Sequence, residues 1–229
     1  MTTPTTQPKA IIFDLLTGLL NSWPVWDSCI PPSERHVASG QTWRKQYLEV
    51  TYNIPGHTYQ PYEDLVHRSA AETGLSPAAP TALIEHMDDI KPWPGVPAIL
   101  VQLKKQGIKL AVVTNCSKKL GQQMVSNLER NVREQTGNKE FAFDLTVTAE
   151  EVGFYKPNPK PYQEALNKLG LEASDALFLA GSSGDIPGAS GVGMKVVWNN
   201  HIGLARKGDL LPLREGSNMG EALGDVLRW

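Results

Sequence analysis

Short apolar runs alternate with amphipathic segments over most of the 229-residue chain. The first run, Ala10–Phe13, is continuous and β-branched, which predicts a strand buried on both faces that ends at Asp14. From Trp93 onward, strand-like and helix-like segments follow one another and predict a parallel sheet with helices on both faces. The expected strands are 108–114, 143–147, 176–180 and 195–198, and the expected helices are 95–106, 117–130, 159–169 and 185–192.

A different pattern occupies residues 20–92. Helical periodicity there covers 33–52, 62–73 and 80–87, with proline-rich breaks between the helices and no convincing strand. Because this block interrupts the alternation after its first strand, we interpret it as an insertion. The predicted division is therefore an α/β core made of residues 1–19 and 93–229, and a helical unit made of residues 20–92. A polar stretch at 131–140 predicts a surface loop.

Composition and charge remove several classes of function. The chain has 22 basic and 24 acidic residues, so its net charge of −2 provides no field that would attract nucleic acid or an anionic membrane. No run of about 20 apolar residues is present to span a bilayer. The two cysteines, Cys29 and Cys116, lack the spacing of a zinc site or a disulfide framework, which fits a cytoplasmic protein.

Polar side chains follow the predicted strands at their carboxyl ends, where open parallel sheets bind ligands. Asp14 ends the first strand, Thr114 and Asn115 end the second, and Asp185 follows the strand at 176–180. Lys156 lies in a loop before a helix and can reach the same crevice. A carboxylate there can act as a nucleophile, a lysine can neutralise it, and a second carboxylate can orient or deprotonate water.

Four ordered segments resemble the motifs of the haloacid dehalogenase-like hydrolase superfamily. They are IIFDLLTGLL, AVVTNCS, YKPNPKPY and LAGSSGDIPGASGVGMKVVWNN, and together they span nearly the whole chain. The resemblance implies a Rossmann-like core with an inserted α-helical cap, and residues 20–92 would be that cap.

Two positions separate the branches of this superfamily. Its magnesium-dependent phosphatases carry an aspartate two residues after the nucleophile and another in the fourth motif, where this chain has Leu16 and Gly181. The 2-haloacid dehalogenases need no metal. The cap segment TWRKQYLEVTY resembles their substrate-binding segment and places Arg44 in that role, and Tyr162 and Asp185 match residues that they keep. The resemblance thus implies no metal and no cofactor.

By resemblance, Asp14 would attack the 2-carbon of a short carboxylic acid, displace halide and form an ester. Water positioned by Asp185 would then release a 2-hydroxy acid. The family usually reads Gly-Thr where this chain reads Thr17-Gly18, so Thr17 is not expected to bond Asp14 in the family manner. The resemblance assigns catalysis to Asp14, Lys156, Asp185 and Thr114, and substrate binding to Arg44, Asn115, Tyr162, Leu16, Thr17 and Ser182.

Three alternatives to an (S)-2-haloacid dehalogenase remain open at this point. A related enzyme would open an epoxide or hydrolyse another activated carbon through the same ester. A magnesium-dependent phosphatase with an altered site is the second, and a binding protein that keeps the fold without the chemistry is the third. The expected partner is a small carboxylic acid, and dimeric relatives leave a homodimer open.

Overall fold

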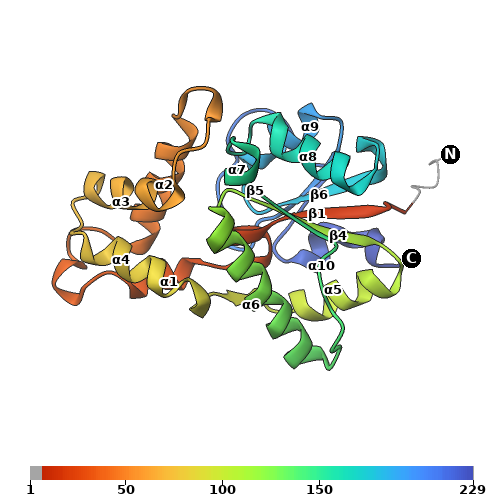
Figure 1. Ribbon diagram of the computed structural model, residues 1–229, viewed down its shortest axis with the longest axis horizontal. Coiled ribbons are helices and arrows are strands. Elements are labelled where there is room, and N and C mark those ends of the chain that lie inside the picture. The colour runs from red at the N-terminus through yellow and green to blue at the C-terminus, as the bar shows by residue number, and fades with distance from the viewer. Residues whose placement is uncertain (1–6, 229) are drawn as a thin grey trace.

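The computed structural model describes residues 7–228 and contains one six-stranded parallel sheet (Figure 1). The strand order is β5-β4-β1-β6-β7-β8, which places the first strand of the chain in the middle of the sheet. The predicted α/β class with a Rossmann-like parallel sheet is confirmed. The strands are β1 (Ala10–Asp14), β4 (Lys109–Thr114), β5 (Leu145–Thr148), β6 (Ala176–Ala180), β7 (Lys195–Asn199) and β8 (Arg214–Gly216).

Strand β1 is apolar from Ala10 to Phe13 because helices cover both faces of the sheet at its centre. Ile11 and Phe13 pack into one apolar core, and Ala10 and Ile12 pack into another on the opposite face. Figure 1 shows one layer of helices below the sheet and a second layer above it. The lower layer contains α5 (Val96–Lys105), α6 (Lys118–Thr136) and α10 (Met219–Leu223), and the upper layer contains α8 (Pro159–Leu169) and α9 (Asp185–Gly191).

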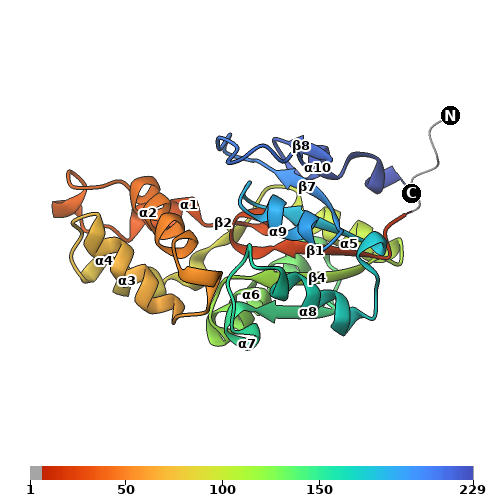
Figure 2. The ribbon, with the colours of Figure 1, turned by 90° about the horizontal axis from the view of Figure 1, so that it is seen from above.

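Four helices lie together beyond the carboxyl end of β1, to one side of the sheet (Figures 1 and 2). They join the core through a two-stranded antiparallel pair, β2 (Leu20–Asn21) with β3 (Lys91–Pro92). Between residues 7 and 228, none of the helices is both long enough and apolar enough to cross a bilayer. The four helices are α1 (Trp23–Ser28), α2 (Gly40–Tyr52), α3 (Tyr62–Glu72) and α4 (Ala78–Glu85).

Buried aromatic side chains hold this helical unit together. The rings of Trp26 and Trp43 meet edge to face with their centroids 4.6 Å apart. The Trp43 indole nitrogen donates to the hydroxyl of Ser69 at 3.0 Å, which satisfies a polar atom in a dry interior. The same apolar cluster continues into the lower face of the sheet through Phe13, so the helical unit and the core share packing. The domain boundaries at residues 20 and 92 stay a prediction.

The structure corrects several expected element bounds. The helix expected at 117–130 continues as α6 to Thr136, so the expected loop at 131–140 begins later. Its apolar face continues through buried Leu128 and Val132, and it ends only where Gly137 adopts a left-handed φ of 72°. The expectation of no strand in residues 20–92 was wrong for β2 and β3, because pairs this short carry no periodic signal. Also unpredicted were α1, α7 (Ala149–Val152), β8 and α10.

Gly40 allows α1 and α2 to approach closely. A β-carbon at this position would lie 2.3 Å from the backbone nitrogen of Asp27 and 2.6 Å from the carbonyl carbon of Trp26. We expect Gly40→Ala to lower the free energy of unfolding by about 1–3 kcal/mol, because backbone cannot move aside as a flexible side chain can. Urea unfolding followed by tryptophan fluorescence measures this. Gly191→Ala is the control, since its β-carbon would meet nothing within 4 Å; equal stabilities of the two variants would contradict the prediction.

Candidate active site

Asp14 presents its two carboxylate oxygens to different groups. It ends β1 and caps the π-helical turn Leu15–Leu19 that follows. Its Oδ2 accepts hydrogen bonds from the Thr17 hydroxyl at 2.8 Å and from the amides of Thr17 and Gly18 at 3.1 and 3.0 Å. The expectation that the reversed Thr17-Gly18 order would cost the threonine bond was therefore wrong, because the tight turn brings both residues to the same oxygen. The other oxygen, Oδ1, accepts from Lys156 at 2.7 Å.

Lys156 bridges the two buried aspartates of the site. Its ammonium lies 2.7 Å from Asp14 Oδ1 and 3.2 Å from Asp185 Oδ1. Burial alone would raise the pKa of Asp14, but the ammonium, Thr17 and Gly18 outweigh it and hold that pKa below its usual value. Burial likewise acts to lower the pKa of Lys156, and the two carboxylates reverse this and raise it. The site therefore holds an anionic Asp14 beside a permanently charged ammonium.

Asn115 fixes the position of Lys156 through its backbone. The amide of Lys156 donates to the Asn115 side-chain oxygen at 2.7 Å, and the side-chain nitrogen of Asn115 donates back to the Lys156 carbonyl at 3.2 Å. Both ends of the Asn115 side chain are thereby engaged. These two bonds position the backbone of Lys156. Asn115 also lines the cavity, and its contact with a substrate stays a prediction.

Thr114 lines the cavity at the end of β4 and is tied to Cys116. Its hydroxyl donates to the Cys116 sulfur at 3.2 Å and accepts from the Cys116 amide at 3.3 Å. Burial raises the pKa of Cys116 to about 12, so the thiol stays protonated at neutral pH. A protonated thiol is a poor nucleophile, because the thiolate is the reactive form.

Asp185 is the second buried carboxylate and begins helix α9. Burial raises its pKa to about 6, against the opposing effect of Lys156. The Tyr162 hydroxyl donates to Asp185 Oδ1 at 2.9 Å. Tyr162 is fully buried behind Asp185 and does not line the cavity, which contradicts its predicted contact with substrate. It orients Asp185 instead.

Arg44 is a buried cation without an acidic partner in the part of the chain that the structure describes. It projects from α2 with only 4% of its surface exposed, and it donates to the Ser22 hydroxyl at 2.6 Å. Its guanidinium lies over the Trp23 ring at 4.6 Å and over the Trp26 ring at 5.6 Å. No carboxylate between residues 7 and 228 forms an ion pair with it, and its Nε has no hydrogen-bond partner there. A buried, unpaired guanidinium is costly, so this position suits an anionic ligand.

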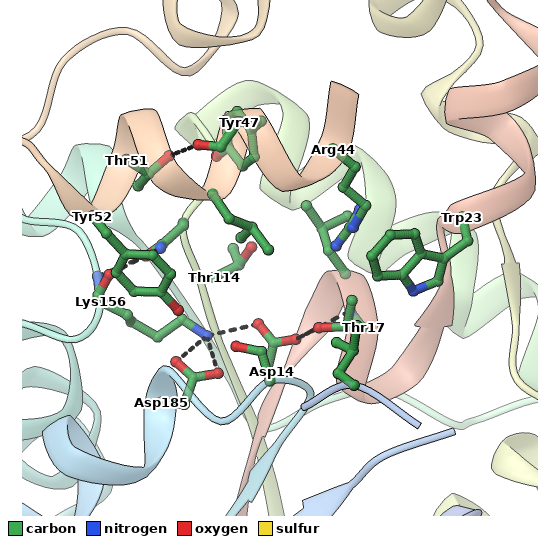
Figure 3. A pocket seen from close by; sticks show the side chains of 15 residues that line it. Asp14, Thr17, Trp23, Arg44, Tyr47, Thr51, Tyr52, Thr114, Lys156 and Asp185 are labelled. Atoms are coloured by element: carbon green, nitrogen blue, oxygen red, sulfur yellow. Dashed lines mark hydrogen bonds and ion pairs between the residues drawn. The ribbon is translucent and has the colours of Figure 1, made fainter. Parts of the chain in front are cut away.

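These side chains surround one cavity of about 50 Å³ between the helical unit and the sheet (Figure 3). Figure 3 shows Lys156 between Asp14 and Asp185, with Arg44 and Trp23 farther along the cavity. The structure thus brings together all the predicted site residues except Tyr162. The lining consists of Asp14, Leu16, Thr17, Trp23, Arg44, Tyr47, Leu48, Thr51, Tyr52, Thr114, Asn115, Lys156, Ser182, Asp185 and Leu204.

Several lining residues were not predicted. Tyr47, Leu48, Thr51 and Tyr52 lie three, four, seven and eight positions after Arg44 on α2. This spacing places them on the same helix face as Arg44, so the sequence contained a signal for them once Arg44 was chosen. Leu204 carried no such signal, because it reaches the cavity from the irregular segment after β7.

Gly181 has no room for a side chain. A β-carbon there would lie 2.2 Å from the Thr17 hydroxyl oxygen, 2.2 Å from the Gly18 nitrogen and 2.4 Å from Asp14 Oδ2. An aspartate at this position, as the phosphatase motif has, would displace the turn that holds Asp14. Residues 7–228 also contain no cluster of three or more His, Cys, Asp or Glu side chains able to hold a metal ion. The donor set here suits magnesium poorly, because Lys156 contacts both carboxylates.

One known protein family matches most of the chain. The family model described as haloacid dehalogenase-like hydrolase matches residues 11–199. The chain belongs to this family. Members of the family found at the sequence level include an (S)-2-haloacid dehalogenase from Pseudomonas sp. (strain YL), 29% identical over 205 residues that cover 85% of this chain and 84% of that protein. The chain is accordingly a hydrolase of the haloacid dehalogenase-like type.

Two further relatives differ in how much of the chain they match. The L-2-haloacid dehalogenase from Xanthobacter autotrophicus has the same fold, with a TM-score of 0.76 at 19% identity over 96% of this chain and 97% of that one. A pyrophosphatase, PpaX, from Halalkalibacterium halodurans is 32% identical, but only over 120 residues that cover 52% of this chain and 50% of that protein. Similarity across nearly the full length is thus to the dehalogenase branch.

Replacing Lys156 with methionine should destabilise the protein in a pH-dependent way. Without the ammonium, burial raises the pKa of both Asp14 and Asp185, so the folded state binds protons that the unfolded state releases. Stability of the variant then falls as pH rises above the ordinary carboxyl range. We expect the free energy of unfolding of Lys156→Met to be about 3–5 kcal/mol below that of the unmodified protein at pH 8, and the difference to be smaller at pH 5.

Urea unfolding at both pH values measures the difference in free energy between Lys156→Met and the unmodified protein. Lys105→Met is the control, because Lys105 is an exposed lysine remote from the site. A deficit that is equal at the two pH values would show that the ammonium does not hold the carboxylates in their ionised form.

Proposed function

We propose that this hydrolase is a 2-haloacid dehalogenase that forms an ester on Asp14 and yields a 2-hydroxy acid and halide without a metal. One observation carries the proposal. A small cavity has an anionic carboxylate beside Lys156 on its core side and the buried, unpaired Arg44 on its helical side. A small anion with an electrophilic carbon fits both ends of this cavity, because the carbon can meet the Asp14 carboxylate while the negative charge meets Arg44.

In the first step, Asp14 Oδ1 attacks the 2-carbon of the substrate. A carbon–oxygen bond forms, the carbon–halogen bond breaks, and the halide leaves with the bonding electron pair. Oδ1 is the better placed oxygen, because it meets only the Lys156 ammonium whereas Oδ2 already accepts three hydrogen bonds. The low pKa of Asp14 keeps the nucleophile ionised. Arg44 receives the departing halide or holds the substrate carboxylate.

In the second step, water attacks the ester carbonyl carbon of Asp14 and gives a proton to Asp185. The carbonyl oxygen at this stage is Oδ2, and the Thr17 hydroxyl and the amides of Thr17 and Gly18 stabilise the negative charge that develops on it. Collapse of the tetrahedral intermediate breaks the bond between the Asp14 carboxyl carbon and Oδ1. Oδ1 takes the proton held by Asp185 and leaves as the hydroxyl of the 2-hydroxy acid. The new carboxyl group of Asp14, which now contains the oxygen of water, loses its remaining proton to solvent, and this regenerates the carboxylate.

Phosphoryl transfer is the less favoured reaction at this site for two reasons. Leu16 stands where a proton donor to a leaving oxygen would be, and leucine has no proton to give. Gly181 stands where a metal-binding aspartate would be, and the packing against Asp14 leaves it no space. The same ester chemistry could open an epoxide, and the assays below separate these substrates.

Halide release from each enantiomer of 2-chloropropionate tests the proposal. We expect the protein to release chloride from one enantiomer, to keep this activity in EDTA, and to lose it on Asp14→Asn substitution. Lys156→Ala should lower kcat/KM by several orders of magnitude, because the nucleophile loses its stabilising cation. Ion chromatography measures the chloride.

The contrary outcomes are distinct. Magnesium-dependent hydrolysis of p-nitrophenyl phosphate that EDTA abolishes, without chloride release, would replace the proposal with a phosphatase. Diol formation from a small epoxide, again without chloride release, would identify another carbon-centred hydrolase with the same nucleophile.

The two steps should also separate by pH. With Asp14 ionised, the pKa of Asp185 is raised to about 6, in part by the charge on Asp14. The ester removes that charge, so the pKa of Asp185 is lower in the intermediate, and acidification below it protonates the base of the second step. Asp14 keeps its low pKa, so the first step continues. We expect the rate of ester hydrolysis to fall about tenfold for each pH unit below the pKa of Asp185 in the intermediate, and the ester on Asp14 to accumulate at acidic pH.

Mass spectrometry of the protein after rapid acid quenching detects the ester. Asp185→Asn is the matched variant, since it should accumulate the same ester at pH 8. Absence of the adduct on Asp14 in both cases, despite continued chloride release, would refute the covalent mechanism.

A further inference from the structure

A second and larger cavity adjoins the catalytic one. It has a volume of about 290 Å³, against about 50 Å³ for the catalytic cavity, which we call the inner cavity. We call the larger one the outer chamber. It lies between helix α2 and the segment that follows β7, and four residues line both spaces. They are Leu48, Tyr52, Ser182 and Leu204.

Tyr52 is the largest of the shared residues and ends helix α2. Figure 3 shows its ring beside Lys156, with the hydroxyl directed toward the aspartates. Burial raises the pKa of Tyr52 to about 12, so the hydroxyl is neutral while the site works. A neutral ring at this place forms a wall between the inner cavity and the outer chamber, and it takes no proton from the reaction.

Gly184 leaves the space that the Tyr52 hydroxyl occupies. A β-carbon on Gly184 would lie 1.5 Å from the Tyr52 hydroxyl oxygen and 2.4 Å from the ring carbon that carries it. The φ of Gly184 is −65°, which any residue can adopt, so glycine is not needed for backbone reasons. The missing side chain therefore serves the fit of Tyr52 against the core.

Lys207 contacts the ring of Tyr52 from the segment after β7. Its ammonium lies 5.2 Å from the centroid of the Tyr52 ring and pairs with Glu49 one turn earlier on α2. Its backbone nitrogen donates to the Ser183 hydroxyl at 2.9 Å. The segment after β7 thus contacts both the helical unit and the core around Tyr52, which holds the ring in place between them.

We propose that Tyr52 is a specificity-determining gate that closes the inner cavity and confines the enzyme to 2-haloacids with a short substituent on the 2-carbon. This rests on the proposed function. The reacting carbon must lie near Asp14 and one of the substrate's two electronegative groups, the carboxylate or the halogen, near Arg44, which together fill the small inner cavity. A longer substituent must then extend past Tyr52 into the outer chamber, where Leu48, Leu204 and Ala205 provide apolar contact.

The ratio of kcat/KM for 2-bromohexanoate to that for 2-bromopropanoate tests the gate. We expect this ratio to rise at least tenfold in Tyr52→Ala, because three additional methylenes gain the outer chamber and each buried methylene is worth about fourfold in affinity. Gly184→Ala should raise the ratio as well, because its β-carbon displaces the tyrosine that remains present.

The double variant distinguishes a gate from general damage to the site. Once Tyr52→Ala has removed the ring, Gly184→Ala has nothing to displace, so the second substitution should leave the ratio unchanged within twofold. Gly191→Ala, in the same helix α9, is the control and should match the unmodified protein. A ratio that stays constant in Tyr52→Ala, or effects of the two substitutions that simply multiply, would overturn the proposal.

Failure of the gate and failure of the proposed function give different results. If the unmodified protein releases no bromide from 2-bromopropanoate, the proposed function fails. Calorimetric binding of lactate and 2-hydroxyhexanoate then reports on the gate without turnover, with the same expected change in selectivity for Tyr52→Ala. If bromide is released but neither ratio changes, the gate alone is wrong.

Discussion

The site depends on one buried ammonium placed between two buried carboxylates. Burial taken alone raises the pKa of either aspartate and lowers the pKa of Lys156. The ammonium of Lys156 lies 2.7 Å from Asp14 Oδ1 and 3.2 Å from Asp185 Oδ1, so the three groups remain charged. Of the two carboxyl groups, Asp14 has the lower pKa and Asp185 the higher. In the mechanism that we propose, this difference in pKa suits one carboxylate to act as nucleophile and the other as base. The two hydrogen bonds between the Asn115 side chain and the Lys156 backbone help to hold the ammonium in place.

The architecture of the sheet explains why these groups meet. Asp14 ends the central strand β1, Thr114 ends its neighbour β4, and Asp185 begins the helix after β6 on the other side. Parallel strands place all these ends along one edge, so residues distant in sequence share one crevice. The helical unit then closes the crevice from above with Arg44 and Tyr52 on one face of α2. In the function that we propose, the sheet supplies the reacting groups and the helical unit supplies the side chains that select the ligand.

Glycine has a special importance where core and helical unit approach. Gly181 lets the Asp14 turn pack closely and leaves no space for a metal-binding side chain, whereas Gly184 leaves space that Tyr52 fills. The two positions are close in sequence but face different parts of the molecule. Gly181 contacts the core at the Asp14 turn, and Gly184 contacts Tyr52 of α2. Under the two proposals above, a single turn of the chain bears on both the type of reaction and the size of the substrate.

The sequence by itself determined the alternation of strands and helices, because apolar periodicity is local. It also predicted that Asp14, Lys156 and Asp185 lie together, because motif order and the ends of parallel strands point to one crevice, and the structure brings the three side chains into contact. The sequence could not determine that Tyr162 lies behind Asp185, that Thr17 bonds Asp14 despite the reversed order, or that Leu204 reaches the cavity. Those facts depend on distances between segments far apart in the chain. Only tertiary packing fixes such distances, since no local pattern records which side chain fills the space that a distant glycine leaves.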